Sequence, residues 1–365
     1  MTGEKRAIKK LSKDKMSDQA RIRLSYEIDI LKNLDHPNIL RLFEVFEDDK
    51  NIFLVTELCN GGELFDELVM NHLGEQLDPA VWEQLQVSDE PAWLQAAAAL
   101  RAEAPALRVE KVDITDPAAV EQALANADPS VVVNSAAYNQ VDVAEKEPVA
   151  AYQANALAVR NLALACRQID ARLIHFSTDY VFDGRAGRAY TEEDETHPLG
   201  AYAVSKLAGE LYARAYVDSA LVIRTSGVYG PGGMKTARGN FVEMMLRMAS
   251  QGQQIKVVDD HVASPTYAPA LASRTLDLLD KNASGIFHVG GGTPISWYDW
   301  AVKIFQAADV QPSLRATNER EFRTPANRPK FSALSNRKME SLGIAPMPSM
   351  DIAIRAYLAA RAENA

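Results

Sequence analysis

This sequence has very little cysteine, no long apolar run and no excess of positive charge. Only Cys59 and Cys166 occur in 365 residues, so neither a disulfide framework nor a cysteine metal site is indicated, and a reducing cytoplasm is expected. No run approaches the ~18 apolar residues of a membrane span, and the N-terminus lacks the apolar stretch of a signal peptide. The sequence therefore predicts a cytoplasmic protein that does not bind a membrane.

Acidic residues outnumber basic ones, 49 to 39, which gives a net charge of −10. The first two dozen residues are locally basic, but this balance provides no broad basic surface, and no nucleic-acid partner is expected. His261 and His288 have no partners at metal-ligand spacing, so no metal site is predicted. An apolar content of 47% is enough for two domains with a buried core.

The pattern of elements changes along the chain. Residues 1–72 alternate one helix, at 20–34, with strands at Arg6–Lys10, Phe43–Phe46 and Ile52–Leu58, which predicts a small α+β fragment. From Leu107 onward, helices alternate with buried strands at 130–134, 172–177 and 220–224. Such alternation is typical of an α/β domain with a Rossmann-like, doubly wound parallel sheet, which we expect over residues 73–365.

The first piece resembles the small lobe of a calcium-dependent protein kinase. Lys9 is similar to the lysine that contacts nucleotide phosphates, Glu27 is similar to its helix partner, and Leu34–Ile39 is similar to the run that follows. Phosphoryl transfer also needs a phosphate-covering glycine loop, a catalytic aspartate and a metal-binding aspartate. We recognise none of these, and therefore expect no kinase activity; a kinase-like fragment that binds ATP stays an alternative.

Tyr202 and Lys206 are the candidate reactive residues of the second piece. Residues four apart on a helix share a face, so the phenol and the ammonium can point into the same cleft. Tyr202 can then act as a general acid for a carbonyl being reduced, and Lys206 can hold the nicotinamide ribose. Thr178, which follows a buried strand, can donate a hydrogen bond to the same carbonyl oxygen. The alternative is a surface pair, with Thr178 capping a turn.

These residues lie in a series of segments that resembles dTDP-4-dehydrorhamnose reductases, which are extended short-chain dehydrogenases. The matching segments, in family order, are Val112–Asp116, Val132–Tyr138, Val141–Asp142 with Ala144–Glu145, Ser177–Gly184, Tyr202–Glu210, Arg224–Gly230, Val257–Asp260 and Ser264–Thr266. The resemblance implies NADPH- or NADH-dependent reduction of the C4 ketone of a deoxythymidine-diphosphate (dTDP) hexose, a step of dTDP-rhamnose biosynthesis.

Carried over position by position, the resemblance assigns catalysis to Thr178, Tyr202 and Lys206. The cofactor would contact Tyr202, Lys206, Asp113, Ile114, Ala136, Ala137, Tyr138 and Asn139. The dTDP-sugar would contact Thr178, Tyr180 and Arg328, whose guanidinium suits a diphosphate; a packed aromatic and an exposed arginine are the alternatives for the last two. The cofactor part is expected mainly over 105–225, the substrate part mainly over 226–345, and a homodimer is a possible assembly.

The family's opening strand, Gly-x-x-Gly-x-x-Gly turn and helix have no counterpart at the expected place. The nearest substitute is the strand at Ile52–Thr56 with the turn that follows it. Counted from Thr56, the three glycine positions of this turn fall on Glu57, Asn60 and Glu63. The run Ile52–Leu58 would also have to fill the vacant strand position in the sheet. Carboxylates repel a pyrophosphate, and Cβ atoms obstruct its approach. Two hypotheses therefore stay open: an active reductase, and a catalytically silent fusion that has lost cofactor binding.

Two more positions bear on the substrate and on the site. Gly227 stands where the family commonly has Trp, so a sugar-stacking contact is missing and the substrate identity is open. Asn155 corresponds to the family's helix asparagine, which is either structural or relay-like, and an ordinary hydrogen-bonded asparagine is the alternative.

Overall fold

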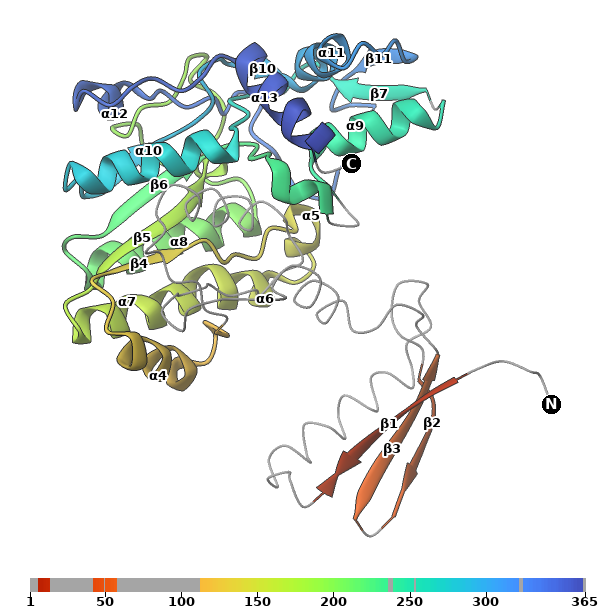
Figure 1. Ribbon diagram of the computed structural model, residues 1–365, viewed down its shortest axis with the longest axis vertical. Coiled ribbons are helices and arrows are strands. Elements are labelled where there is room, and N and C mark those ends of the chain that lie inside the picture. Colours follow the sequence, from red (N-terminus) through yellow and green to blue (C-terminus); the bar gives the residue numbers. More distant parts are fainter. Residues whose placement is uncertain are drawn as a thin grey trace. The chain divides into compact units, whose positions relative to one another are not determined.

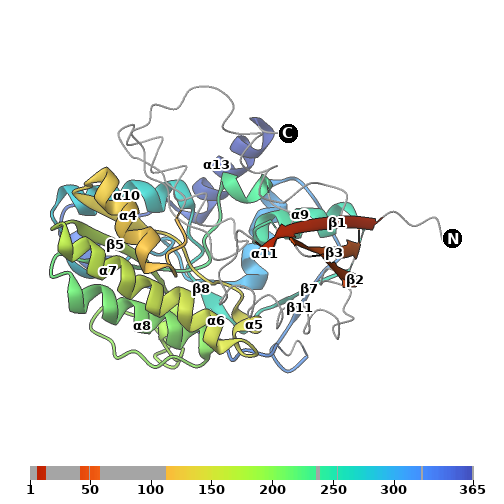
Figure 2. The ribbon, with the colours of Figure 1, turned by 90° about the horizontal axis from the view of Figure 1, so that it is seen from below.

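The computed structural model describes residues 6–13, 42–48, 50–57, 112–235, 239–252, 254–321 and 324–363. The chain divides into two compact units, Met1–Leu77 and Asp78–Ala365, which are taken in turn (Figures 1 and 2). The predicted helix at 20–34, with Glu27, lies outside the described residues. So do positions 58–111, which include two of the three expected glycine positions.

The described strands of the first unit form a three-stranded antiparallel sheet. They are β1 (Arg6–Ser12), β2 (Leu42–Glu47) and β3 (Asn51–Glu57). β3 is the central strand, and both of its edges are hydrogen-bonded, one to β1 and the other to β2. The three predicted strands are therefore present, but the suggestion that Ile52–Leu58 fills the vacant position of the reductase sheet is wrong, because β3 has no free edge.

The second unit is built on a parallel sheet, whose described strands lie in the order β4-β5-β6-β9. These strands are β4 (Val131–Asn134), β5 (Arg172–Thr178), β6 (Leu221–Thr225) and β9 (Gly285–His288). In the register, Val131 pairs with Arg172, and Ile174 pairs with Leu221. The strands predicted at 130–134, 172–177 and 220–224 match within one residue at each end, and the predicted parallel α/β fold is confirmed.

Helices bury both faces of this sheet. Leu173 and Val222 lie in one apolar cluster with residues of α7 (Ala158–Gln168) and α8 (Ala201–Tyr216). Their neighbours along the strands, Ile174, Leu221 and Ile223, lie in another cluster with Leu271 and Leu278 of α10 (Ala268–Asp280). Successive strand residues point to opposite faces, so a sheet covered on both sides needs unbroken apolar strands. Figure 1 shows α10 on one side of the sheet and α7 and α8 on the other.

Shorter elements complete the sheet-bearing part of the unit. They are α4 (Pro117–Ala127), α5 (Val141–Ala144), α6 (Pro148–Tyr152), the π-helix η2 (Gln153–Leu157) and the 3₁₀-helix η3 (Asp179–Val181). α4 begins with a proline, and the side chain of Asp116 accepts from the backbone N–H groups of Ala118 and Ala119. An N-cap carboxylate of this kind satisfies N–H groups that have no partner within the helix.

Most C-terminal elements pack around a second core that includes several aromatic side chains. Its helices are η4 (Pro231–Lys235), α9 (Phe241–Ser250), α11 (Trp297–Ala307) and α13 (Met350–Glu363), whereas α12 (Arg337–Ser341) packs with Met339 in the cluster that includes α10. Its strands are β7 (Ile255–Val258), paired with β11 (Leu314–Thr317), and β8 (Val262–Ala263), paired with β10 (Ile295–Ser296). Trp300 and Tyr229 are fully buried, with ring centroids 5.3 Å apart.

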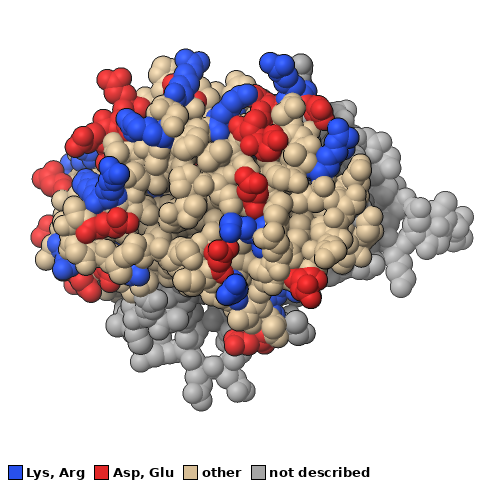
Figure 3. Space-filling view, turned by 90° about the horizontal axis from the view of Figure 1, so that it is seen from above, with Lys and Arg blue, Asp and Glu red and all other residues tan. Residues whose placement is uncertain are grey.

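The face of the molecule drawn in Figure 3 carries charges of both signs. Figure 3 shows Lys and Arg interspersed with Asp and Glu over one face, without a broad region of one sign. Within the described residues, no helix has both the length and the apolar content needed to cross a membrane.

Candidate functional site

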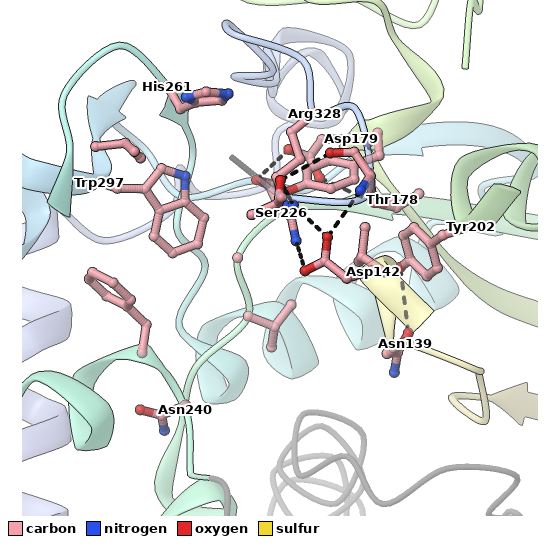
Figure 4. Close-up of a pocket in the computed structure, with 18 of the residues that line it drawn as sticks. Asn139, Asp142, Thr178, Asp179, Tyr202, Ser226, Asn240, His261, Trp297 and Arg328 are labelled. Atoms are coloured by element: carbon pink, nitrogen blue, oxygen red, sulfur yellow. Dashed lines mark hydrogen bonds and ion pairs between the residues drawn. The ribbon is translucent and has the colours of Figure 1, made fainter. Parts of the chain in front are cut away.

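A pocket of about 1190 Å³ lies at the carboxyl ends of β5 and β6. Its lining comes from both parts of the second unit: the strand ends and α8 on one side, and α9, α11 and the loop around residues 319–330 on the other (Figure 4). Ligands of open α/β sheets bind outside the carboxyl ends of the strands. The fold therefore places a large cavity where a cofactor and a substrate could meet.

Tyr202 and Lys206 both line this pocket from the first turns of α8. The Lys206 side chain is buried, and its Nζ donates to the backbone oxygen of Phe176, 2.6 Å away. Burial lowers the pKa of Lys206 to about 8, and the charge of Glu210 acts in the opposite direction. The Tyr202 hydroxyl donates to Oδ1 of Asn139 at 3.4 Å. The two residues therefore share one cleft instead of forming a surface pair.

Thr178 ends β5 and lines the pocket beside Tyr180. Its Oγ1 accepts from the Tyr180 backbone N–H at 3.2 Å and donates to Oδ1 of Asp179, also at 3.2 Å. The Tyr180 ring lies edge-on to that of Tyr202, with centroids 6.2 Å apart. Burial raises the pKa of Tyr180 to about 12. The residues predicted to face the ketone and the sugar thus lie together at one strand end.

The strand end after β4 supplies the residues expected to face the cofactor. Ala137 and Asn139 line the pocket, whereas Ala136 and Tyr138 are buried and do not. Asp113 and Ile114 are not in its lining either: Asp113 Oδ1 accepts from the backbone N–H of Thr115, and Ile114 packs in the core. All six remain predicted cofactor contacts.

Asn155 is fully hydrogen-bonded beneath this strand end. Its Oδ1 accepts from the Tyr138 backbone N–H at 2.8 Å, and its Nδ2 donates to the Tyr138 carbonyl and to Ser205 Oγ, both at 2.9 Å. Ser205 in turn donates to the backbone oxygen of Tyr202. Asn155 therefore ties η2 to the strand end and to α8, which agrees with the structural reading of this position.

Arg328 lines the pocket but is paired with a carboxylate. Its two terminal nitrogens donate to the two oxygens of Asp142 at 2.9 and 2.8 Å. Thr324 Oγ1 accepts a further hydrogen bond from the same guanidinium. The sequence places Asp142 in a segment that matches the family, Val141–Asp142, but assigns it no role; its position on α5 brings it to the pocket.

Two further sets of lining residues were not predicted. Asp179 is almost fully buried and accepts from Ser226 and Ser332. Facing it, an apolar wall is formed by Phe241, Met244, Met248, Trp297 and Trp300; Figure 4 shows Trp297 across the pocket from Tyr202. Among the described residues, no group of three or more His, Cys, Asp or Glu is arranged to hold a metal ion.

Comparison with known proteins identifies the family of the second unit. The model of the RmlD substrate binding domain matches residues 91–362, about three quarters of the chain. The chain belongs to the dTDP-4-dehydrorhamnose reductase family. It is 41% identical over 265 residues to the dTDP-4-dehydrorhamnose reductase of Mycobacterium tuberculosis strain H37Rv, covering 71% of this chain and 85% of that protein. It is 37% identical over 256 residues to the spore coat polysaccharide biosynthesis protein SpsK of Bacillus subtilis, covering 70% and 88%.

Solved structures of this reductase family share the fold. The Bacillus anthracis dTDP-4-dehydrorhamnose reductase, in complex with NADP, aligns with a TM-score of 0.70 at 31% identity, covering 75% of this chain and 97% of that one. The Clostridium acetobutylicum orthologue aligns with a TM-score of 0.69 at the same identity, covering 75% and 97%.

The first unit matches a different family. The protein kinase domain model matches residues 1–85, directly before the reductase match. The predicted resemblance of the N-terminal piece to protein kinases is confirmed. Its resemblance to the calcium-dependent kinases in particular stays a prediction.

Proposed function

We propose that the second unit reduces the C4 ketone of a dTDP-4-keto-6-deoxyhexose with NADPH or NADH. The observation that supports this most directly is the meeting of Tyr202, Lys206 and Thr178 in one pocket at the sheet edge. The family membership supports the substrate class, and the NADP-bound relative from Bacillus anthracis supports the cofactor.

The residues at the nicotinamide end of the pocket fit such a cofactor. Ala137 offers a small side chain at the strand end, Asn139 offers an amide, and Lys206 offers a buried ammonium within the same cavity. The cofactor, when bound, supplies the hydride.

The chain's own groups would handle the ketone oxygen. Tyr202 donates its phenolic proton to that oxygen as negative charge develops there. Lys206, four residues further along α8, places a positive charge behind the phenol and favours the phenolate that proton transfer leaves. Thr178 donates a hydrogen bond to the same oxygen, a contact that strengthens as charge develops.

The rest of the pocket suits a sugar nucleotide. Lys256, Arg320, Arg328 and Lys330 are the cations among its lining residues apart from Lys206, and they offer partners for a diphosphate. Phe241 and Trp297, whose rings lie edge to face with centroids 4.9 Å apart, provide apolar surface for a base or a sugar ring. These contacts, including that of Tyr180 with the sugar, are part of the proposal.

The second candidate is a catalytically silent fusion. It is favoured by the sequence, in which the family's Gly-x-x-Gly-x-x-Gly turn has no counterpart at its expected place, because that turn lets the backbone approach the pyrophosphate. The two candidates differ in one property, cofactor affinity.

The deciding experiment titrates the full chain with NADPH and NADH and then measures oxidation of the bound cofactor after addition of a dTDP-4-keto-6-deoxyhexose. We expect saturable binding and turnover, with kcat lowered by about 10²–10⁴ in Tyr202→Phe and cofactor affinity unchanged in that variant. Folded protein that binds neither cofactor at millimolar concentration would establish the silent fusion. Introduction of charge by Ala137→Asp, at a position that lines the pocket, serves as the negative control for binding.

Assembly and location complete the proposal. A homodimer is supported by exposed apolar side chains on the outer face of α6 and α8, namely Val149, Val204 and Leu211. A cytoplasmic location is supported by the scarcity of cysteine and by the buried, unbridged thiol of Cys166.

A further inference from the structure

Asp179 lies at the pocket edge with three hydroxyl groups around its carboxyl. It is 2% exposed and begins η3, directly after β5. Oδ2 accepts from Ser226 Oγ at 2.7 Å and from Ser332 Oγ at 2.5 Å, and Oδ1 lies 3.2 Å from Thr178 Oγ1. The three hydroxyls come from three distant parts of the chain, and Figure 4 shows Asp179 between Thr178 and Ser226.

The hydroxyl of Thr178 has a single hydrogen to donate. Its oxygen already accepts from the Tyr180 backbone N–H. If Asp179 is ionised, that hydrogen points to Asp179 Oδ1 and is lost to a ketone in the pocket. If Asp179 carries a proton on Oδ1, the direction of this hydrogen bond reverses, because the carboxylic acid donates to Thr178 Oγ1. The hydrogen of Thr178 is then available to the ketone oxygen.

We propose that Asp179 is a positioning residue that acts in its neutral form: it donates from Oδ1 to Thr178, so that Thr178 donates to the ketone oxygen. The inference rests on the proposed reductase function. Asp179 keeps its proton throughout, so the hydride and the Tyr202 proton remain the groups transferred. Ser226 and Ser332 continue to donate to Oδ2, which orients the carboxyl so that Oδ1 faces Thr178.

The environment of Asp179 makes the neutral form accessible. Burial raises its pKa to about 6, although the hydroxyls of Ser332, Ser226 and Thr178 act in the opposite direction. The other titratable groups of the pocket are Tyr180 from η3, Tyr202 and Lys206 from α8, Asp142 from α5, Lys256 from β7, His261 from the turn after it, and Glu319, Arg320, Arg328 and Lys330 from the loops beyond β11. Because turnover requires neutral Asp179, we expect the reductase activity to fall as pH rises through the pKa of this residue.

The test replaces Asp179 by an amide that imitates the neutral acid. In Asp179→Asn, Nδ2 can donate to Thr178 while Oδ1 accepts from Ser226 and Ser332. We expect kcat within about threefold of the wild type at pH 5.5, higher than the wild type at pH 8, and no inflection near pH 6. Asp179→Ala should lower kcat about tenfold below the wild type at pH 5.5, the equivalent of one lost hydrogen bond, and should show no inflection near pH 6. An Asn variant as slow as the Ala variant, or one that retains the inflection, would overturn the proposal.

A second variant shifts the same inflection without touching Asp179. Ser332→Ala removes a hydrogen bond that favours the ionised carboxyl, so we expect the inflection in the pH–rate profile to move to higher pH. A shift to lower pH, or none, contradicts the proposal. Asp218→Asn repeats the Asp179→Asn change at an exposed position. It is the matched control for that variant and should keep the wild-type pH–rate profile. Thermal unfolding and NADPH titration of each variant report folding independently of turnover.

A direct titration separates this inference from the proposed function. Carbon-13 NMR of labelled aspartate carboxyls, with Asp179→Asn to assign the signal, gives the pKa of Asp179 whether or not the enzyme turns over. We expect titration near pH 6, and a carboxyl that stays ionised down to pH 5 would overturn the inference. Absence of turnover in a wild type that shows the expected titration would refute the reductase function instead.

Discussion

Arg328 and Asp142 form a two-point ion pair between segments 186 residues apart in the sequence. Asp142 belongs to the short helix α5 beside the cofactor strand end, and its Oδ1 also accepts from the backbone N–H of Ala326. Arg328 belongs to the loop around residues 319–330, which lines the pocket. The pair holds that loop against α5 and fixes the plane of a guanidinium that faces the pocket, an arrangement in which arginine and lysine are not equivalent.

Replacement of Arg328 by lysine should weaken substrate binding more than catalysis. Lysine keeps the charge but loses the planar fork, so we expect KM for the dTDP-sugar to rise about tenfold, the equivalent of ~1.4 kcal/mol, with kcat within about threefold. Steady-state kinetics at saturating NADPH measure both constants. Arg337→Lys, at an exposed position outside the pocket, is the control. An unchanged KM together with a lower melting temperature would mean that Arg328 serves only to tie the loop.

The buried ion pair of Glu210 and Arg224 should be important for stability. Arg224 Nε and Nη2 donate to the two Glu210 oxygens at 2.9 and 2.7 Å, and both side chains are almost fully buried. In Glu210→Ala the guanidinium would stay buried without a counter-charge, which typically costs about 3–5 kcal/mol. Urea unfolding measures the loss. Arg188→Ala breaks a pair of similar geometry with Asp194 in which the arginine is exposed, and it should cost much less stability than Glu210→Ala; equal losses would contradict the argument.

The sheet and the reactive pair could be predicted because their signals are local. Short, mainly apolar runs predicted β5 and β6, since each strand is buried on both faces. The four-residue spacing of Tyr202 and Lys206 predicted a shared helix face. Each signal lies within a short stretch of sequence, and both β5 and α8 occur where the sequence predicted them.

The contacts that complete the site could not be predicted in this way. Ser332 meets Asp179 across 153 residues, and Asp142 meets Arg328 across 186. Both carboxylates lie in segments that match the family, but a local pattern does not identify their partners, because a hydrogen bond between distant segments depends on how the loops return to the sheet edge. The prediction for β3 failed for a related reason: strand propensity was evident, but the choice of partner strands was not.

The buried charge of Lys206 should lower the free energy of unfolding at neutral pH, although the proposed reaction requires it. Its pKa is lowered to about 8 by burial, so between pH 8 and ~10.4, the ordinary lysine value, the unfolded chain binds more protons and stability rises with pH. Lys206→Met removes the buried charge, and we expect it to raise the free energy of unfolding by about 1–3 kcal/mol at pH 7. The gain should shrink as pH rises above 8, and reductase activity should be lost. Lys281→Met, at an exposed site, is the control; a destabilised Lys206→Met at pH 7 would refute the argument.

Gly209 should be the position of α8 least tolerant of a side chain. A Cβ there would lie 2.2 Å from the backbone oxygen of Asn155 and 3.3 Å from Nε2 of His175, so α8 would have to move away from η2. Because the side chain of Asn155 also holds Ser205, that movement would disturb the turn that bears Tyr202. We expect Gly209→Ala to lower the free energy of unfolding by about 1–3 kcal/mol and to reduce kcat/KM. Ala215→Ser adds one atom on the exposed face of the same helix and should change stability by under ~0.5 kcal/mol. Urea unfolding compares the two, and similar stabilities would mean that the close approach of α8 and η2 is not required.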